Sequence, residues 1–174
     1  MPEKEIVLLG NPQLLKSSRR LEQGEAGIAL KIAADLRDTL HSFRETRGWG
    51  RAISAPQIGE LKQVIYLELD GSEIFINPVL SDFSDETFEV WDDCLSFPDL
   101  LVKVRRHQSC RITYRDEKWN PITRIIKDSE SELLQHEVDH LNGIVATMRA
   151  IDGSHFALQS QRDLLGSDGF ANVI

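Results

Sequence analysis

The sequence predicts a single α+β domain in which antiparallel sheets surround a central metal-binding helix and a long helix comes first. Three observations support this class. An apolar stripe of helical period covers residues 25–46, short strand-like segments fill 63–127, and a second helical segment follows at 129–142. Helices and strands are grouped in separate runs, which is typical of α+β folds. A chain of 174 residues suits one domain, taken as residues 1–174.

The first helix is expected from Glu25 to Thr46. Apolar residues recur there at three- and four-residue steps, which gives one buried face. The stretch RGWG then breaks the pattern with two glycines, and a glycine-rich loop, GRAISAPQIG (50–59), follows. The expected buried stripe consists of Ile28, Ala29, Ile32, Ala33, Leu36, Leu40 and Phe43.

The middle of the chain changes to the period of strands. Its segments are short and rich in β-branched or aromatic residues, and turn-forming stretches such as DG and DEKWNP separate several of them. The last segment is expected to return as the second strand of a hairpin. The expected strands are QVIYLEL (63–69), EIFINP (73–78), TFEVW (87–91), LLVKV (100–104), SCRITY (109–114) and TRIIK (123–127).

The second helix is expected to begin with a capping box. Ser129 is followed by Glu132 three residues later, just before an apolar-periodic run. Gly143 stands where the helix would end. A short terminal helix is expected in SHFALQSQRDLLG (154–166), and the tail GSDGFANVI (166–174) is either mobile or a docked strand.

Composition excludes several classes of protein. The chain is 41% hydrophobic and 28% charged, as in ordinary soluble proteins, and no apolar run approaches the roughly 20 residues of a membrane span. Its start, MPEKEIVLLG, lacks the layout of a secretory signal, so we expect a cytoplasmic protein. A net charge of −8 argues against direct nucleic-acid binding through a basic face, leaving only a local patch at Arg105-Arg106. Two cysteines form no disulfide framework.

The stretch LLQHEVDHLNG (133–143) contains half of a metal site. His136 and His140 are four residues apart, so on a helix they project from one face toward one ion. Glu137 lies about 100° round from His136 and can act as general base for a metal-activated water, the H-E-x-x-H arrangement. The alternative is an ordinary semi-exposed helix face.

The third ligand is open on spacing alone. A metzincin would have a histidine at position 146, which is Ala146, and no glutamate follows Glu137 to complete a thermolysin-type site. Cys94 is favoured, because it follows two acids between a strand and a proline-bounded turn, and one thiolate with two imidazoles leaves a fourth position for water. The other candidates are His41, His107, Cys110, Asp152 and His155; His107 lies in a basic stretch, RRH, expected to be solvated.

Three stretches in order resemble the peptide deformylase family. The family pattern is G-x-G-x-A-A-x-Q, then E-G-C-L-S, then Q-H-E-x-x-D/H. This chain has GRAISAPQ (50–57), DDCLS (92–96) and QHEVDH (135–140). The third stretch matches fully, the second keeps Cys-Leu-Ser, and the resemblance covers nearly the whole chain.

The resemblance implies one divalent metal ion per chain, usually Fe(II) in cells, with zinc, nickel or cobalt able to substitute. It also implies that a water molecule attacks a formyl group and that formate leaves. By position it makes Cys94, His136 and His140 the metal ligands and Glu137 the acid and base. It makes the Gln57 amide and the Leu95 N–H the donors to the oxyanion. It also makes Asp92 and Arg106 a supporting ion pair, for which the alternative is a minor ion pair exposed to solvent.

The substrate-facing positions depart from the family pattern. Ala52 replaces a glycine and Ser54 an alanine, while Asp92-Asp93 replaces Glu-Gly, where the glycine can serve an unusual backbone angle. Arg51 replaces an aliphatic residue, and Leu101 stands where many relatives have an arginine that contacts the peptide. The residues that the resemblance places beside the substrate are Gly50, Arg51, Ala52 and Leu101.

Four functional hypotheses follow. The first is a metal-dependent hydrolase that removes the formyl group from N-formylmethionyl peptides, with possible proximity to the ribosome and no membrane partner. The second keeps the chemistry but acts on another N-formyl or small N-acyl compound, as Arg51, Ala52 and Leu101 suggest. The third is a weakly active paralogue that serves as a binding module, against which the intact Glu137 argues. The last is a generic H-E-x-x-H metalloprotease.

Overall fold

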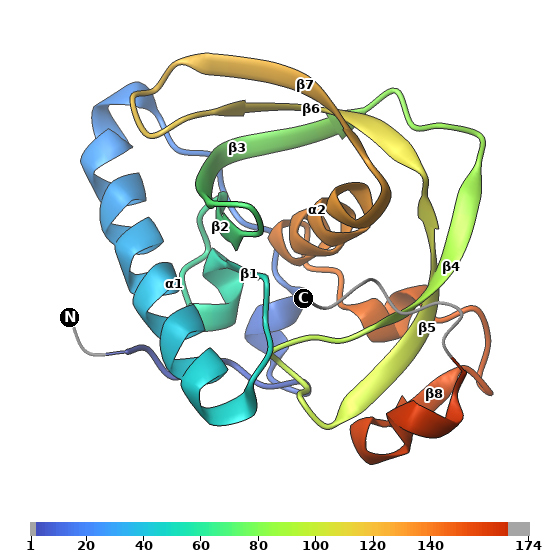
Figure 1. Ribbon diagram of the computed structural model, residues 1–174. Coiled ribbons are helices and arrows are strands. Elements are labelled where there is room, and N and C mark those ends of the chain that lie inside the picture. Colours follow the sequence, from blue (N-terminus) through green and yellow to red (C-terminus); the bar gives the residue numbers. More distant parts are fainter. Residues whose placement is uncertain (1–2, 167–174) are drawn as a thin grey trace.

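The computed structural model describes residues 3–166 and places one helix between two antiparallel sheets. The larger sheet has the strand order β1-β2-β3-β6-β7 and the smaller one β4-β5-β8. Helix α2 lies at the centre and α1 covers the outside of the larger sheet (Figure 1). The predicted α+β class, with a long first helix and a central second helix, is confirmed. The helices are α1 (Ala26–Arg47) and α2 (Asp128–Leu141), and the strands are β1 (Ala52–Ser54), β2 (Val64–Glu68), β3 (Ser72–Ser81), β4 (Thr87–Asp92), β5 (Leu100–His107), β6 (Ser109–Arg115), β7 (Pro121–Lys127) and β8 (Phe156–Leu158).

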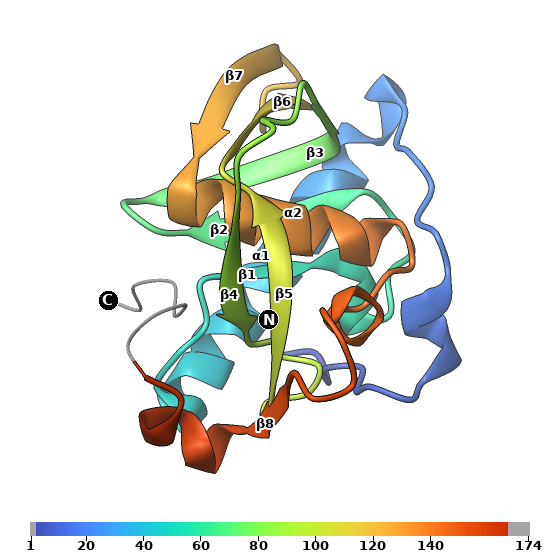
Figure 2. The same cartoon turned by 90° about the vertical axis from the view of Figure 1, so that its right-hand side faces the viewer.

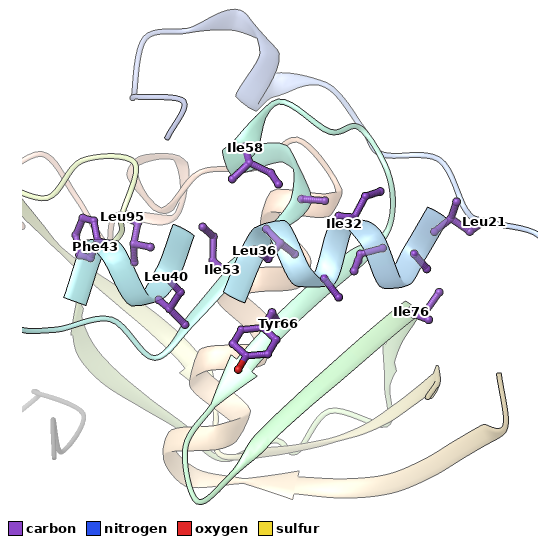
Figure 3. Packing of buried hydrophobic residues seen from close by; sticks show 14 residues of the cluster. Leu21, Ile32, Leu36, Leu40, Phe43, Ile53, Ile58, Tyr66, Ile76 and Leu95 are labelled. Carbon is purple, nitrogen blue, oxygen red and sulfur yellow. The ribbon is translucent and has the colours of Figure 1, made fainter. Parts of the chain in front are cut away.

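Helix α1 packs through one apolar face against β1, β2 and β3 (Figure 3). The expected stripe is buried except at Ile28, which is 47% exposed, so that part of the prediction is wrong. Four residues turn an α-helix by about 40° more than a full circle. Ile28 lies three such steps before Leu40, so when Leu40 faces the sheet, Ile28 has rotated away from it. Ala29 takes the buried position instead.

Strand β2 is buried on both faces. Val64 and Tyr66 join the cluster under α1, whereas Ile65 and Leu67 join the cluster that contains α2 residues. Successive side chains of a strand point to opposite faces, so a strand without a polar face fits between two helices. This double burial fixes α2 against the inner face of the larger sheet.

All six predicted strands are present, and the structure extends one of them. Strand β5 continues to His107, and Arg106 is only 3% exposed. The expectation of a solvated RRH stretch is therefore wrong at Arg106, because β4 pairs beside it and Asp139 of α2 covers its guanidinium. The glycine-rich loop 50–59 also contains a short strand, β1, followed by a 3-10 turn at Ala55–Ile58.

The beginning of α2 differs from the prediction. No side chain caps the helix at Lys127, so the expected capping box of Ser129 and Glu132 is wrong. Glu132 instead lies inside the molecule, where it meets Arg51, and Ser131 donates a hydrogen bond to the His107 carbonyl. Glu132 therefore forms a tertiary ion pair instead of the helix cap that the local sequence pattern predicted.

The end of α2 follows the prediction. The helix ends at Leu141, and Gly143 has a φ of +75°. A Cβ at Gly143 would lie 2.6 Å from the Leu15 carbonyl oxygen, so this position requires glycine for both its backbone angle and its space. The Ser18 N–H donates to the Leu141 carbonyl at 2.7 Å, which satisfies one of the carbonyls left free at the helix end.

The segment expected to form a short terminal helix is helical only in its second half, and there as a 3-10 helix. Residues Phe156–Leu158 pair with β5 as strand β8, and a 3-10 helix follows at Gln159–Leu164. Figure 2 shows β4 and β5 crossing in front of α2, with β8 at their lower end. The predicted tail falls almost entirely in residues 167–174, outside the described residues. Among residues 3–166 no helix combines the length and apolar character needed to cross a bilayer.

Candidate metal centre and active site

Three side chains of metal-ligating type converge where the loop after β4 meets α2. Cys94 Sγ lies 3.2 Å from His140 Nε2, which lies 3.1 Å from His136 Nε2. All three residues are buried. The two histidines reach the same point because four residues complete about one helical turn. Cys94 lies opposite them, two residues after the end of β4 at Asp92.

A chain of charged groups supports His136 from behind. Its Nδ1 lies 2.8 and 2.9 Å from the two carboxylate oxygens of Asp92, which also accepts a hydrogen bond from Arg106 Nη2 at 3.0 Å. Arg106 Nη1 reaches Asp139 at 2.6 Å, and Asp139 in turn accepts from Arg149. Burial would raise the pKa of Asp92, but the charges of His136 and Arg106 lower it to about 2. The alternative of a minor exposed Asp92–Arg106 pair is wrong, since both side chains are buried.

The donor set fits a divalent cation. With its Nδ1–H directed at Asp92, His136 turns Nε2 toward the second imidazole nitrogen at 3.1 Å, so both rings present a nitrogen to one point where a cation can bind. A tetrahedral ion with bonds of about 2.0–2.3 Å separates its ligand atoms by roughly 3.3–3.6 Å, close to the distances found. One thiolate and two imidazoles suit zinc, iron, nickel and cobalt alike. Among residues 3–166 no second cluster of such ligands is found.

The other histidines and acids considered as ligands lie elsewhere. His41 pairs with Glu68 and His155 with Asp152, both in ion-pair geometry. His107 Nδ1 faces the Ser84 carbonyl. Cys110 is buried between β6 and α2, within 3.8 Å of Ser131 Oγ. Of the candidates weighed from the sequence, only Cys94 meets the two histidines.

Glu137 lies beside the cluster and is buried. One of its oxygens, Oε2, has no hydrogen-bond partner in the described structure, and the Ser54 side chain lies near the carboxylate. Burial raises the pKa of Glu137, although the charge of His136 opposes this. A carboxylate with one free oxygen and a raised pKa is suited to take up and release a proton.

Two hydrogen-bond donors border the same space. Gln57 Nε2 lies 3.5 Å from Cys94 Sγ and 3.3 Å from Ser96 Oγ, and its oxygen accepts from the Ser54 N–H at 2.9 Å. That last bond fixes which end of the amide faces the site. The described part of the chain offers no acceptor for the Leu95 N–H, while the Leu95 side chain packs with the end of α1 (Figure 3).

The amino-terminal segment connects the loops that hold these donors. The Val7 N–H donates to the Gln57 carbonyl and the Leu9 N–H donates to the Ser96 carbonyl, both at 2.8 Å. Residues 7–9 therefore fix the loop of β1 to the loop that contains Cys94, which are remote from each other in sequence.

A small cavity of about 20 Å³ opens beside the cluster. Gly50, with φ +120°, lines it, and a Cβ there would come within 3.2 Å of Leu40. Ala52 lies in strand β1 without strain, and Asp93 is not among the residues with positive φ, so neither departure from the family pattern disturbs the backbone. The residues around the cavity are Trp49, Gly50, Arg51, Ala52, Gln57, Asp92, Asp93, Cys94, Leu95, Glu132, Leu133, His136 and Glu137.

Leu101 is the one predicted substrate contact that the structure does not bring to this cavity. It is fully buried in β5, opposite Ala157 of β8. The expectation that it faces the substrate is therefore not supported. Successive side chains of β5 point to opposite faces of the smaller sheet, and the face on which Leu101 lies is not the one that borders the cavity.

Several site residues were absent from the sequence prediction. Glu132 could not be recognised as a site residue, because its partner Arg51 is 81 residues away in sequence. Arg149 pairs with Asp139 only ten residues away, but across the turn that follows α2, where no local pattern predicts the contact. Asp139 stands inside the quoted QHEVDH stretch, but its spacing alone gives no partner. Gln135, in the same stretch, binds both the His107 N–H and its carbonyl and so fastens α2 to β5.

Comparison with known proteins agrees with this geometry. A family model described as polypeptide deformylase matches residues 3–155. A peptide deformylase of Prochlorococcus marinus is 34% identical over 161 residues, covering 87% of this chain and 74% of that protein. Peptide deformylase 1 of Nitrosomonas europaea is 31% identical over 160 residues, covering 86% and 88%.

Solved structures agree as well. A peptide deformylase from Synechococcus elongatus in complex with actinonin superposes with a TM-score of 0.80 at 25% identity, over 98% of this chain and 88% of that one. The Thermotoga maritima enzyme, at 23% identity, gives the same TM-score over 87% of this chain and 100% of its own, a likeness of fold. The chain belongs to the polypeptide deformylase family.

Proposed function

We propose that this chain is a metal-dependent hydrolase that removes the formyl group from the amino end of newly made polypeptides and releases formate. The observation that supports this most directly is the convergence of Cys94, His136 and His140 beside the unpartnered oxygen of Glu137. A cation site next to a buried base is what the hydrolysis of an unactivated amide requires. The names of the relatives point to the same reaction.

The reaction consumes one water molecule. The oxygen of water bonds to the formyl carbon, the carbon–nitrogen bond breaks, and the products are formate and a free amino group. A divalent cation held by Cys94, His136 and His140 supplies the positive charge that acidifies the water and polarises the formyl oxygen.

The chain's own groups move the proton and bind the developing negative charge. Glu137 takes a proton from the water and gives it to the departing nitrogen. Gln57 Nε2 and the Leu95 N–H donate to the formyl oxygen as it becomes negative, a contribution of about 3–4 kcal/mol for each donor. The buried pair of Asp92 and Arg106 holds the His136 ring in the orientation that directs Nε2 at the metal position.

The finer assignments belong to the same proposal. Fe(II) is the metal that the family resemblance leads us to expect in cells. Zinc, nickel or cobalt can substitute, because the donor set of one thiolate and two imidazoles suits all four ions. A substrate that appears during translation places the activity in the cytoplasm, near the ribosome. The family match over residues 3–155 supports one domain for the 174-residue chain.

The test is anaerobic loading with Fe(II), followed by formate release from formyl-Met-Ala-Ser and metal analysis of the same sample. Glu137→Gln is expected to lower kcat at least about 10³-fold, since the general base is lost, while one metal ion per chain remains. Glu130→Gln, on the same helix but paired with Arg124, is the matched control and keeps normal turnover. Full turnover by the Glu137 variant, or no formate from the metal-loaded protein, would overturn the proposal.

One observation favours a second substrate class. Arg51 Nη2 and Glu132 Oε2 form an ion pair, 3.2 Å apart, in the wall of the cavity beside the metal ligands. A purely apolar substrate side chain would make few favourable contacts with this pair. The same chemistry on a different formylated compound is therefore the second candidate.

A further inference from the structure

The cavity next to the metal ligands is very small. Its volume of about 20 Å³ is enough for about one water molecule. Since Cys94, His136 and Glu137 border it, the part of a substrate nearest the reacting carbon has to lie against the residues that line it. The side chains that line it therefore decide what that part can be.

Arg51 lines the cavity and has an unsatisfied donor. Its side chain is 12% exposed, and Nη2 makes a single contact with Glu132 at 3.2 Å. Nη1 is buried and finds no acceptor in the described structure. A buried N–H without a partner has lost its hydrogen bonds to water without compensation, and a ligand that brings an acceptor oxygen restores one of them.

Acids surround this guanidinium. Glu132 is almost fully buried, and Asp93 lines the same cavity while Arg162 approaches it from outside at 3.5 Å. An additional carboxylate would face these acids, and an additional cation would face Arg51 and the metal position. The cavity therefore suits a group without net charge.

We propose that Arg51 and Glu132 select formylated substrates whose first residue has a small, neutral side chain with an acceptor oxygen, such as serine, threonine or asparagine. This inference rests on the proposed deformylase chemistry and specifies the second candidate, a formylated compound other than a polypeptide that begins with formyl-methionine. The side-chain oxygen accepts from Arg51 Nη1, and the hydroxyl or amide hydrogen donates to the acids opposite.

Methionine fits this cavity less well. Its thioether is a weak acceptor, so Arg51 Nη1 stays unsatisfied when a methionine side chain covers it. The protein also has to bury an apolar group against an ion pair, without the apolar contacts that would offset the cost of desolvating the pair.

The decisive experiment is a panel of formyl-X-Ala-Ser peptides in which X is Ser, Thr, Asn, Met or Asp, assayed with the Fe(II)-loaded protein. We expect kcat/KM for X = Ser or Asn to exceed that for Met at least tenfold, and Asp to be poorest. A second readout is the dissociation constant of the same peptides for the metal-loaded Glu137→Gln protein, measured by calorimetry, which should rank them in the same order.

The double variant Arg51→Leu/Glu132→Leu removes both charges together and leaves neither one buried alone. It is expected to reverse the order in favour of Met. Arg47→Leu, which removes an exposed arginine paired with Asp99, is the control and keeps the wild-type order.

The outcomes separate the two proposals. Equal turnover of all neutral peptides, or Met as the best substrate, overturns the selectivity inference and leaves the deformylase function intact. Absence of formate from every peptide overturns the function itself. Because the wild-type panel decides both questions, a variant that fails to fold does not affect the result.

Discussion

Asp92 accepts hydrogen bonds from a metal-site histidine and from a buried arginine at the same time. Without it, His136 loses the group that fixes its tautomer, and Arg106 keeps only Asp139 as a partner. Removal of one member of a buried pair costs more than the pair contributes, because the remaining charge is left desolvated. Asp92 therefore affects both metal affinity and stability.

We expect Asp92→Asn to weaken metal binding about 10–100-fold and to lower the free energy of unfolding by about 3 kcal/mol. Chelator competition measures the first effect and denaturant unfolding the second. Glu89→Gln is the matched control, because its pairs with Lys103 and Arg105 are exposed; it should change stability by less than about 0.5 kcal/mol. A normal metal affinity in the Asp92 variant would contradict the role given to this carboxylate.

Glu132 gives the protein a pH dependence of defined sign. Burial and the charge of Asp92 raise its pKa from 4.5 to about 7, against the opposing effect of Arg51. A carboxyl whose pKa is higher in the folded state holds its proton there while the unfolded chain has released it, so stability falls as pH rises from 4.5 through 7.

Glu132→Gln removes this ionisation. Thermal unfolding from about pH 5 to about pH 8 should show the wild type losing up to about 3 kcal/mol more stability than the variant over that interval. Parallel curves for the two proteins would show that Glu132 is already ionised at the acidic end of the range. Glu130→Gln, on the same helix and paired with Arg124, is expected to follow the wild type.

At the scale of elements, the carboxyl end of α2 depends on one residue. Gly143 combines a left-handed φ of +75° with a site where a Cβ would lie 2.6 Å from the Leu15 carbonyl oxygen. Both obstacles involve backbone rather than a flexible side chain, so neither relaxes easily.

Gly143→Ala is expected to lower the free energy of unfolding by about 2 kcal/mol or more. Gly27→Ala, near the exposed start of α1 where nothing lies within 4 Å of the new Cβ, should instead raise it by a few tenths to about 1 kcal/mol. Denaturant unfolding of the two variants measures both effects. Equal effects of the two substitutions would mean that the α2 terminus is not under this constraint.

The elements differ in how far the sequence predicts them. The periodicity of α1 and the alternation of β2 to β7 depend on local burial, which residue spacing records directly. The start of α2 did not follow its local pattern, because Glu132 is drawn to Arg51, 81 residues away in sequence. Strand β8 was missed for a related reason: its pairing with the edge of β5 is a tertiary contact without a local signal.

At the scale of the whole molecule, the metal position joins parts that are distant in sequence. Cys94 belongs to the loop of the smaller sheet, and His140, 46 residues later, to the helix packed on the larger one. A ligand that binds only the folded state adds stability in proportion to its occupancy, and here it also holds the two sheets' elements together.

Removal of the metal with a chelator should lower the melting temperature reversibly. At free metal about 100-fold above Kd the added stability is about 2.7 kcal/mol, or roughly 5–10 °C for a chain of this size. Calorimetric scans with and without Zn²⁺ measure it. Cys94→Ala should abolish the metal-dependent difference, whereas Cys110→Ala, a buried cysteine outside the site, should retain it even at a lower melting temperature.

The site was predictable to the extent that its residues lie in short motifs. The sequence placed His136, Glu137 and His140 on one helix turn and favoured Cys94 as the third ligand, and the resemblance to the family pointed to the same cysteine. It did not reveal the ion pair of Arg51 with Glu132, because nothing local links a loop residue to a helix residue so far along the chain. The departure at Arg51 was visible; its partner was not.

The amino-terminal segment has a practical consequence. Residues 7 and 9 hydrogen-bond to both loops that hold the oxygen-binding donors, so a displacement of this segment would also displace those two loops. A fusion partner, a tether or a surface attachment that moves residues 7–9 would therefore shift Gln57 and Leu95 and change the activity.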